Sequence, residues 1–504
     1  MSQFLAEQQA LHERAWSTGY DLFPGVLKSK GARIGVEVGV AFGGHAEAIL
    51  TYSDVRKLYG VDSYQHVAGY RDPMNLPQAQ FDALHERTKK RLSPFGDRFE
   101  LIRARSSDAA GIIREALDFV YLDADHTYEG VRGDLCAWYP KVREGGLIGG
   151  HDYGHPNFQG VKQAVDEFFR RFKWGVRLEG EGVWWVEKQA LNTSFIMPAY
   201  NCAKTVRQSV ESILEGGLND GDRLIIVDDG STDETGRILD DLRRRYHVIE
   251  VVKHRENKGG GAARNTAVES TDSEILFCLD SDNILVPGSL QKLKACLVNC
   301  GADVAAFQEL YYFVDDKAHV THKWVFRQGP ITLADCLAGH VAPPGSGNYM
   351  FTRESWSRAG GYPEFAGALD AWGFGFRQLA TGARMITLRN SFYYHRYGLD
   401  SYWVRQSRCR NVSLTALQIV LPFLDLLYEK DVDYILGRKG RYAWFENLER
   451  HPIRLRSGET GMTGIKVDMK PDNHWNGKPI SRLVTRAIKK AIGFAARQPR
   501  PRRS

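Results

Sequence analysis

The sequence lacks the features that would place it in a membrane or in an oxidising compartment. No run approaches the ~20 consecutive apolar residues that a membrane-spanning helix requires, and the N-terminal stretch has no signal-peptide core. The seven cysteines are odd in number and scattered, at positions 136, 202, 278, 296, 300, 336 and 409. They form neither a disulfide framework nor a zinc pattern, so we expect a cytoplasmic protein with reduced thiols.

Acidic residues are absent after Asp472, where nine lysines and arginines gather. Because the whole chain carries only +6, the remainder is mildly acidic and we expect no nucleic-acid partner. Apolar residues between Ile480 and Ala495 recur at helical spacing among the basic ones, which predicts a basic amphipathic helix. This helix either makes a peripheral contact with the inner face of an anionic membrane, or is a solvated tail or a segment docked on the protein.

The chain of 504 residues is too long for a single core, and both halves alternate strand and helix patterns. We therefore predict the α/β class, with two doubly wound domains at residues 1–188 and 192–400. A helical extension is expected at 401–455, followed by a loop and the basic amphipathic tail at 456–504.

A strand, a glycine-rich turn and a helix open the first half. The strand is expected at 34–38, the turn at 39–44 and the helix from His45, an arrangement that lets backbone N–H groups approach a ligand. The glycines fall at 39, 43 and 44, and Glu37 lies inside the strand. This spacing departs from G-x-G-x-x-G and disfavours an NAD-dependent enzyme.

Polar residues end the later strands of this half. A second strand ends at Asp62, a fourth runs into Asp123, Asp125 and His126, and a fifth ends at His151–Asp152. Carboxyl ends of parallel strands share one edge of a sheet, where open α/β sheets place their sites. Taken together over roughly residues 30–170, these motifs resemble class I S-adenosylmethionine (SAM) methyltransferases that act on sugars and small molecules.

This resemblance implies SAM as cofactor, with Asp62 in the place of the ribose-binding carboxylate. The cofactor-binding residues would be Glu37, Gly39, Gly43, Asp62 and Asp123. Methyl transfer to a hydroxyl needs a base, for which His151 is the candidate, and Asp123 with Asp152 could hold a divalent ion. The alternatives are that either histidine of this edge is a hydrogen-bonded structural residue and that Asp62 is a simple turn residue.

In the second half, an apolar run at 275–279 predicts a buried parallel strand that leads into Asp280, Ser281 and Asp282. Carboxylates beside a core are costly unless they are paired or bound to metal. Two acids at D-x-D spacing can share one Mg²⁺ or Mn²⁺ that keeps open positions for phosphate oxygens. The alternative is that Asp282 only caps the helix expected near Pro287.

Three further motifs precede this pair: P-A-Y-N at 198–201, V-D-D-G-S-T-D at 227–233 and N-K-G…A-A-R-N at 257–265. In this order they resemble family 2 glycosyltransferases of the GT-A fold. The resemblance implies a nucleotide-diphosphate sugar as donor, with Asp280 on ribose and metal and Asp282 on the metal. It also places Arg264 and Asn265 on a loop facing the nucleotide, and the base beside Ala199, Tyr200 and Asp229 or Asp228.

The acceptor side is less well defined. Where the family carries a Glu-Asp pair just before a helix, this chain has Leu369–Asp370, so Asp370 alone is the candidate catalytic base of an inverting transfer. Its alternative is a helix N-cap. His395 lies where relatives carry a further metal ligand or phosphate contact, unless it is an ordinary strand-end histidine. Trp372 and Trp403 could stack on sugars, although aromatic residues more often belong to the core.

The sequence thus predicts a bifunctional enzyme of polysaccharide biosynthesis. One activity would be metal-dependent, inverting transfer of a sugar to a glycan or lipid-linked acceptor, and the other SAM-dependent O-methylation of a sugar. Two alternatives remain open: a glycosyltransferase whose first domain is a non-catalytic scaffold, and a non-catalytic glycan-assembly protein.

Overall fold

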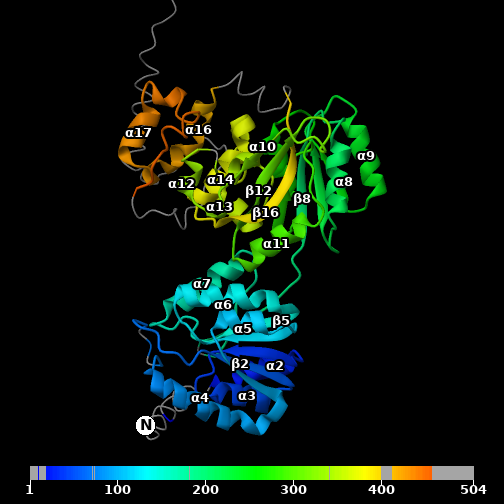
Figure 1. Ribbon diagram of the computed structural model, residues 1–504. Coiled ribbons are helices and arrows are strands. Elements are labelled where there is room, and N and C mark those ends of the chain that lie inside the picture. The colour runs from blue at the N-terminus through cyan, green and yellow to red at the C-terminus, as the bar shows by residue number, and fades with distance from the viewer. Residues whose placement is uncertain are drawn as a thin grey trace, which may run out of the picture. The chain divides into compact units, whose positions relative to one another are not determined.

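The computed structural model describes residue 10, residues 19–398 except 71, 73, 181 and 340, and residues 411–456. The chain divides into a first compact unit, residues 1–190 with 299–301, and a second that covers the remainder (Figure 1). The predicted basic amphipathic helix and Trp403 lie outside the described residues. Within the described part, no helix has the length and apolar character needed to cross a bilayer.

The first unit is built on a seven-stranded sheet in the order β3-β2-β1-β4-β5-β7-β6. The first five are parallel: β1 (Ile34–Val38), β2 (Lys57–Asp62), β3 (Phe99–Arg103), β4 (Leu117–Leu122) and β5 (Val142–Gly150). The last two, β7 (Val183–Glu187) and β6 (Arg177–Glu179), are antiparallel to their neighbours. The predicted strands are all present, whereas β6 is three residues long and gave no sequence signal.

Helices cover both faces of this sheet (Figure 1). On one face lie α2 (Leu22–Ser29), α3 (Gly44–Tyr52) and α4 (Gln78–Leu92), and on the other α5 (Ser106–Ile112), α6 (Tyr128–Trp138) and α7 (Gln159–Arg170). Because both faces are covered, the central strands are almost continuously apolar, as in the buried pattern of β4. The prediction of a doubly wound α/β unit is confirmed.

Gly39 is required by the fold itself. It has a φ of +92°, and a Cβ atom at this position would lie 1.9 Å from the carbonyl oxygen of Asp123. The turn after β1 therefore passes directly against the end of β4, which only glycine permits.

The second unit contains a mixed sheet in the order β10-β9-β8-β11-β15-β12-β16-β14, with β13 paired to β12. A parallel half is formed by β8 (Thr193–Ala199), β9 (Arg223–Asp228), β10 (Ile249–Lys253) and β11 (Ile275–Cys278). The other half contains β12 (Val304–Phe313), β13 (His322–Val325), β14 (Gly329–Ile331), β15 (Tyr349–Thr352) and β16 (Met385–Arg396). Strands β12 and β16 are parallel, and β13, β14 and β15 are antiparallel to their neighbours.

The helices of this unit are α8 (Val206–Glu215), α9 (Thr235–Arg245), α10 (Gly260–Glu269), α11 (Ser289–Asn299), α12 (Leu333–Cys336), α13 (Arg353–Ala359), α14 (Asp370–Ala380), α16 (Val412–Val420) and α17 (Glu429–Leu436). The expectation of a loop around Arg264 and Asn265 is wrong, because both lie on α10. Gly259, with a φ of +96°, ends the preceding loop. The helix begins with Gly260 and Gly261, which are weak helix formers, so burial of Ala263, Ala267 and Val268 favours it more than intrinsic propensity does.

Helices α16 and α17 belong to the same apolar core as α14. Trp372 of α14 stacks on Phe376 at 5.4 Å and meets Phe445 edge-on at 4.7 Å between ring centroids. It is 7% exposed, so it is a core residue and is not available to stack on a sugar.

Candidate active sites

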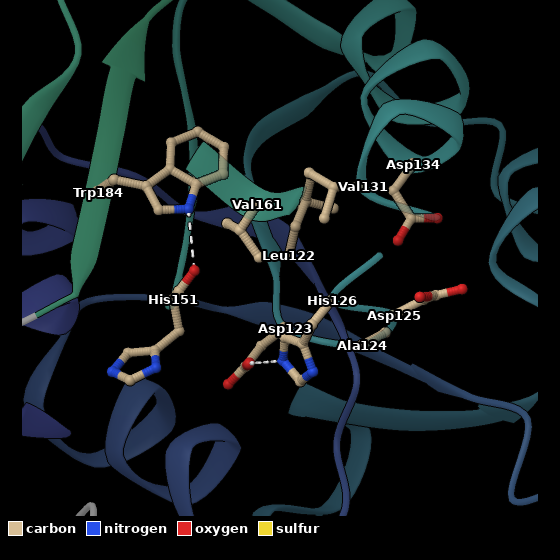
Figure 2. Close-up of a pocket in the computed structure, with 10 residues that line it drawn as sticks. All are labelled: Leu122, Asp123, Ala124, Asp125, His126, Val131, Asp134, His151, Val161 and Trp184. Carbon is tan, nitrogen blue, oxygen red and sulfur yellow. Dashed lines mark hydrogen bonds and ion pairs between the residues drawn. The ribbon is translucent and has the colours of Figure 1, made fainter. Parts of the chain in front are cut away.

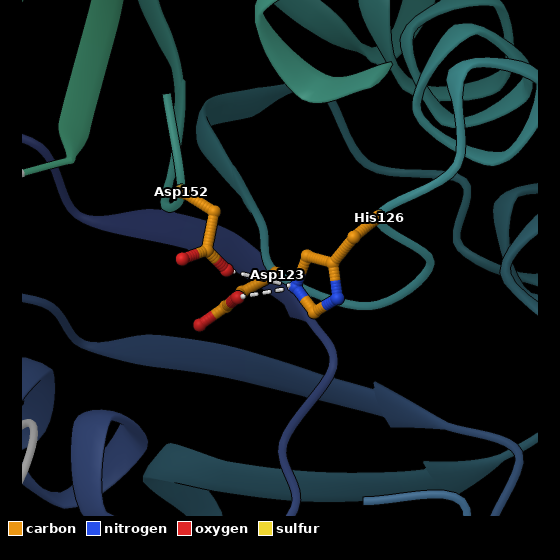
Figure 3. A group of neighbouring side chains, drawn as sticks. All are labelled: Asp123, His126 and Asp152. Atoms are coloured by element: carbon orange, nitrogen blue, oxygen red, sulfur yellow. Dashed lines mark hydrogen bonds and ion pairs between the residues drawn. The ribbon is translucent and has the colours of Figure 1, made fainter. Parts of the chain in front are cut away.

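Three side chains meet at the carboxyl ends of β4 and β5 in the first unit (Figure 3). The Nε2 atom of His126 lies 3.4 Å from Oδ1 of Asp123 and 3.0 Å from Oδ2 of Asp152. Among the described residues, this is the one group of three or more His, Cys, Asp or Glu side chains whose ligand atoms all lie within 4.8 Å of one another. The predicted meeting of Asp123 and Asp152 is therefore observed, with His126 between them.

A third carboxylate, that of Asp72, faces the other ring nitrogen of His126. Nδ1 of His126 lies 3.1 Å from Oδ2 of Asp72, which stands in the segment between β2 and α4. Burial lowers the pKa of His126, but bonds to Asp123, Asp152 and Asp72 outweigh burial and raise it to about 12. Asp72 stands in a segment without any recognisable motif, so no sequence pattern pointed to it.

His151 lines a small pocket beside this group, together with Asp134 and Trp184 (Figure 2). Its Nδ1 atom is 3.2 Å from Oδ1 of Asp152, and Trp184 Nε1 donates to its carbonyl oxygen. Burial lowers the pKa of His151, but Asp152 and the Asp123 charge raise it overall. Asp152 itself has a φ of +59°, a strained backbone conformation for a residue with a side chain.

Two of the predicted cofactor-binding acids have different hydrogen-bond partners: Glu37 contacts a side chain, and Asp62 accepts from backbone N–H groups. Oε1 of Glu37 lies 2.7 Å from Nδ1 of His45, whereas Glu37 Oε2 and His45 Nε2 are buried without a hydrogen-bond partner in the part of the chain that the structure describes. Asp62 accepts from the backbone N–H groups of Val40, Ala41 and Tyr64. It therefore fixes the turn after β1.

A polar cleft opens at the carboxyl ends of β2 and β3, next to Asp62. It is lined by Ser63, Gln65, Gln78, Arg103, Ala104 and Arg105.

In the second unit, one guanidinium joins the predicted metal-binding acid and the predicted base. Arg264 Nη2 donates to Oδ1 of Asp280 and Nη1 to Oδ2 of Asp370, both at 2.6 Å. Arg264 and Asp370 are buried, and Asp370 begins α14. Burial raises the pKa of Asp370 although the charge of Arg264 opposes it. Residues far apart in the sequence thus converge at the carboxyl end of β11.

Asp282 follows on the same turn. Burial, and then the charge of Asp280, raise the pKa of Asp282 to about 7. The side chain of Arg396 contacts the backbone of this turn, where its Nε donates to the carbonyl oxygen of Asp282. The site therefore contains the carboxylates of Asp280, Asp282 and Asp370, with the Arg264 guanidinium between Asp280 and Asp370 and the Arg396 guanidinium beside the Asp282 turn.

His395 lies near this turn, with Nδ1 3.3 Å from the Tyr393 hydroxyl, and burial lowers its pKa to about 4. Among the described residues, Asp280, Asp282 and His395 do not bring three ligand atoms within 4.8 Å of one another.

Asn348 holds Asp280 in place from the opposite side. Its Oδ1 accepts from the backbone N–H of Asp280 at 2.7 Å, and its Nδ2 donates to Oδ2 of Asp280 at 3.2 Å. Asn348 is fully buried. It directly precedes β15, after the glycines at positions 345 and 347.

The aspartates after β9 bond within the domain. Oδ1 of Asp229 accepts from Lys258 N–H and lies 2.6 Å from His254 Nδ1, while its Oδ2 accepts from Gly259 N–H. Asp228 accepts from Ser231 N–H. Asp229 thus holds the loop before α10, with His254, which no motif indicated, in the same network, whereas Asp228 holds the turn after β9.

Of the other predicted donor-site residues, Ala199 is buried and Tyr200 is 45% exposed at the end of β8. The side-chain amide of Asn265 bonds Tyr362 through both backbone groups and also Glu364 and Trp356. Asn265 therefore ties α10 to the turn that leads to Asp370.

Two family models match the chain. Residues 194–358 match glycosyl transferase family 2, and residues 33–153 match a methyltransferase domain. The prediction of these two families is confirmed, and Asp370 lies beyond the matched part of the glycosyltransferase model.

Similar proteins include chondroitin synthase of Escherichia coli, 39% identical over 131 residues, which are 26% of this chain and 18% of that protein. Glycosyltransferase GlyG of Streptococcus pneumoniae is 34% identical over 24% of this chain and 40% of its own length. Poly(ribitol-phosphate) beta-N-acetylglucosaminyltransferase TarP of Staphylococcus aureus is 27% identical over 29% and 45%. The chain spans less than half the length of each of these relatives.

Among solved structures, S. aureus TarS 1–349 in complex with UDP-GlcNAc matches 51% of this chain and 72% of that chain. The TM-score is 0.41 and the sequence identity is 19%.

Asp134 provides a test of the electrostatics around the first site. Burial, opposed by a hydrogen bond with Ser106, raises its pKa to about 7, whereas an unfolded aspartate titrates near ~3.9. The stabilisation by the protonated acid is therefore full below pH ~4 and is lost as pH rises through about 7. Asp134→Asn should raise the stability of the first unit at pH 8 by roughly 2–4 kcal/mol and change it little at pH 4.

Thermal denaturation of both proteins at the two pH values measures this difference, with exposed Asp108→Asn as the matched control. An equal shift at both pH values would contradict the assigned environment.

Proposed function

We propose that this chain, which joins a methyltransferase domain to a family 2 glycosyltransferase domain, transfers a sugar from a nucleotide-diphosphate sugar and methylates a sugar hydroxyl with SAM. The observation that carries the first activity is the contact of Arg264 with both Asp280 and Asp370 at 2.6 Å. It places a candidate metal ligand and a candidate base around one point at the carboxyl edge of the sheet.

The donor set of the second unit fits a divalent cation. Asp280, Asp282 and Asp370 carry three negative charges when ionised, and Arg264 supplies one positive charge among them. Burial and the charge of Asp280 hinder the ionisation of Asp282, so a cation bound beside it would stabilise the charged form. Mg²⁺ or Mn²⁺ on Asp280 and Asp282 would offset the charge of the diphosphate leaving group.

The protein's own residues would orient the reactants. Asp370 accepts the proton of the acceptor hydroxyl, and its raised pKa suits a base that must hold a proton. Asn348 fixes Asp280 through two hydrogen bonds. The exposed ring of Tyr200 at the end of β8 can stack on the nucleotide base.

The acceptor class that we propose is a cell-surface polysaccharide or a lipid-linked precursor of one. The names of the similar proteins, which mention chondroitin and poly(ribitol-phosphate), support this proposal.

For the first unit, we propose O-methylation with His151 as the base. The free Oε2 of Glu37 and Nε2 of His45 are buried polar atoms that a bound amino-acid group could satisfy. The cleft beside Asp62 has room for the polar remainder of SAM. Asp123, His126 and Asp152 could hold a divalent ion that orients a sugar diol. The scaffold alternative is favoured by one contact, since Asp62 already bonds three backbone N–H groups.

The glycosyltransferase proposal is tested by hydrolysis of UDP-sugars without an acceptor. With Mn²⁺ the protein should release UDP from one member of a donor panel, and excess EDTA should abolish release. Asp282→Asn should lower the rate at least about 100-fold, as expected when a preorganised charge contact is lost. Exposed Asp220→Asn is the control and should match the wild type. Equal rates in Asp282→Asn, or release unaffected by EDTA, would refute metal-dependent transfer through this acid.

The methyltransferase proposal is tested by calorimetric titration with SAM. We expect one SAM per chain, with binding about 10-fold weaker in Glu37→Gln, a loss of ~1.4 kcal/mol. Exposed Glu86→Gln serves as the control. If the wild type binds no SAM at millimolar concentration, the first unit is a scaffold.

A further inference from the structure

A row of aromatic rings crosses three strands next to the glycosyltransferase site. Tyr312 of β12 is in register with His395 of β16 on one side and with His322 of β13 on the other. Residues paired across neighbouring strands point to the same face of a sheet, so the three rings lie side by side. The Tyr312 and His322 rings are stacked and nearly parallel, with centroids 4.3 Å apart and an interplanar angle of 8°. The centroids of Tyr312 and His395 are 4.8 Å apart.

The inner end of the row is connected to Asp280 by hydrogen bonds. Nδ1 of His395 lies 3.3 Å from the Tyr393 hydroxyl, which accepts from Nδ2 of Asn348 at 3.2 Å. The same Nδ2 donates to Asp280. The row therefore begins at the side chains that hold the candidate metal ligand.

The outer end is open to solvent. All four residues of β13 are exposed, and so is Tyr397, at 42%. The Tyr397 ring stands 6.2 Å from both Tyr312 and His322, at 77° and 84° to their planes. His322 and Tyr397 thus form an exposed corner of two rings that carry polar atoms at their edges.

The chemistry of this corner suits a neutral sugar ring. The C–H faces of a pyranose stack on aromatic rings, while its hydroxyl groups bond to phenol and imidazole atoms. The row contains no ammonium or guanidinium group, which are the groups that recognition of a phosphate favours. It also contains no carboxylate. The residues concerned are His395, Tyr312, His322 and Tyr397. The nearest cation on β13 is Lys323, whose Nζ lies 4.1 Å from the centroid of Tyr311. Because residues alternate along a strand, Lys323 points to the opposite face.

We propose that the row His395–Tyr312–His322, with Tyr397, is the acceptor subsite of the second unit and binds a neutral pyranose ring of the acceptor glycan. This inference rests on the proposed glycosyltransferase function, since the row is assigned to the acceptor because hydrogen bonds connect it to Asp280. It assigns acceptor recognition to the β12–β13 hairpin rather than to Trp372.

The test uses the full-length double variant His322→Ala/Tyr397→Ala, because both side chains are exposed and their removal leaves the core intact. Lys323→Ala is the matched control, on the same strand but the opposite face. Transfer is measured with a panel of p-nitrophenyl β-glycosides as acceptors. The double variant should raise the acceptor KM on the order of 10-fold, from the loss of one or two ring contacts. UDP release without acceptor should stay at the wild-type rate.

A binding measurement separates this inference from the proposed activity. Saturation-transfer NMR with methyl β-D-glucopyranoside and its N-acetylglucosamine analogue, in the presence of UDP and diamagnetic Mg²⁺, should show transfer to the sugar ring protons for wild type and Lys323→Ala. The signal should be lost in the double variant. A wild-type signal that persists in the double variant, the absence of any signal in wild type, or an unchanged acceptor KM would overturn the proposal. Failure of UDP release alone would instead refute the proposed function.

Discussion

The contact on which the second unit depends is the guanidinium of Arg264 between Asp280 and Asp370. A buried carboxylate is costly unless it is paired, and here two are paired by a single cation. Asp282 stands beside them without an equivalent side-chain partner, and its pKa is raised accordingly. The remaining negative charge supports the proposal that this edge of the sheet binds a divalent ion beside a departing diphosphate. Helix α10 fixes the Arg264 guanidinium between the end of β11 and the start of α14.

The first unit also groups several acids around one cationic side chain, which is His126 instead of an arginine. His126 lies among Asp72, Asp123 and Asp152, and those acids raise its pKa to about 12. In both units a protein cation gathers acids at the carboxyl ends of parallel strands, where open α/β sheets present their sites. Each site sets one cation against three carboxylates. In the first site all three acids contact His126 directly, whereas in the second Asp282 lies outside the ion pairs of Arg264.

The sequence could predict the acids but not the groups that hold them. Apolar runs that end in aspartate mark strand ends directly, so Asp123, Asp152, Asp280 and Asp282 could be located without coordinates. Arg264 and its partner Asp370 are 106 residues apart in the sequence, and Asn348 and its partner Asp280 are 68 residues apart. No local pattern encodes such pairings. The family resemblance predicts a loop at Arg264, whereas burial of Ala263 and Ala267 favours the helix that the structure contains. The aromatic row likewise appears only when three strands are in register.

The central claim is that Asp280, together with Asp282 outside the ion pairs, binds a divalent ion and a nucleotide at the same time. The most direct measurement is a Mn²⁺ titration followed by electron paramagnetic resonance, with and without UDP, in an Asp152→Asn background that weakens the other candidate metal site. The account predicts one Mn²⁺ per chain that binds more tightly when UDP is present and is lost in Asp282→Asn. Mn²⁺ binding that is indifferent to UDP and unchanged in Asp282→Asn would contradict it.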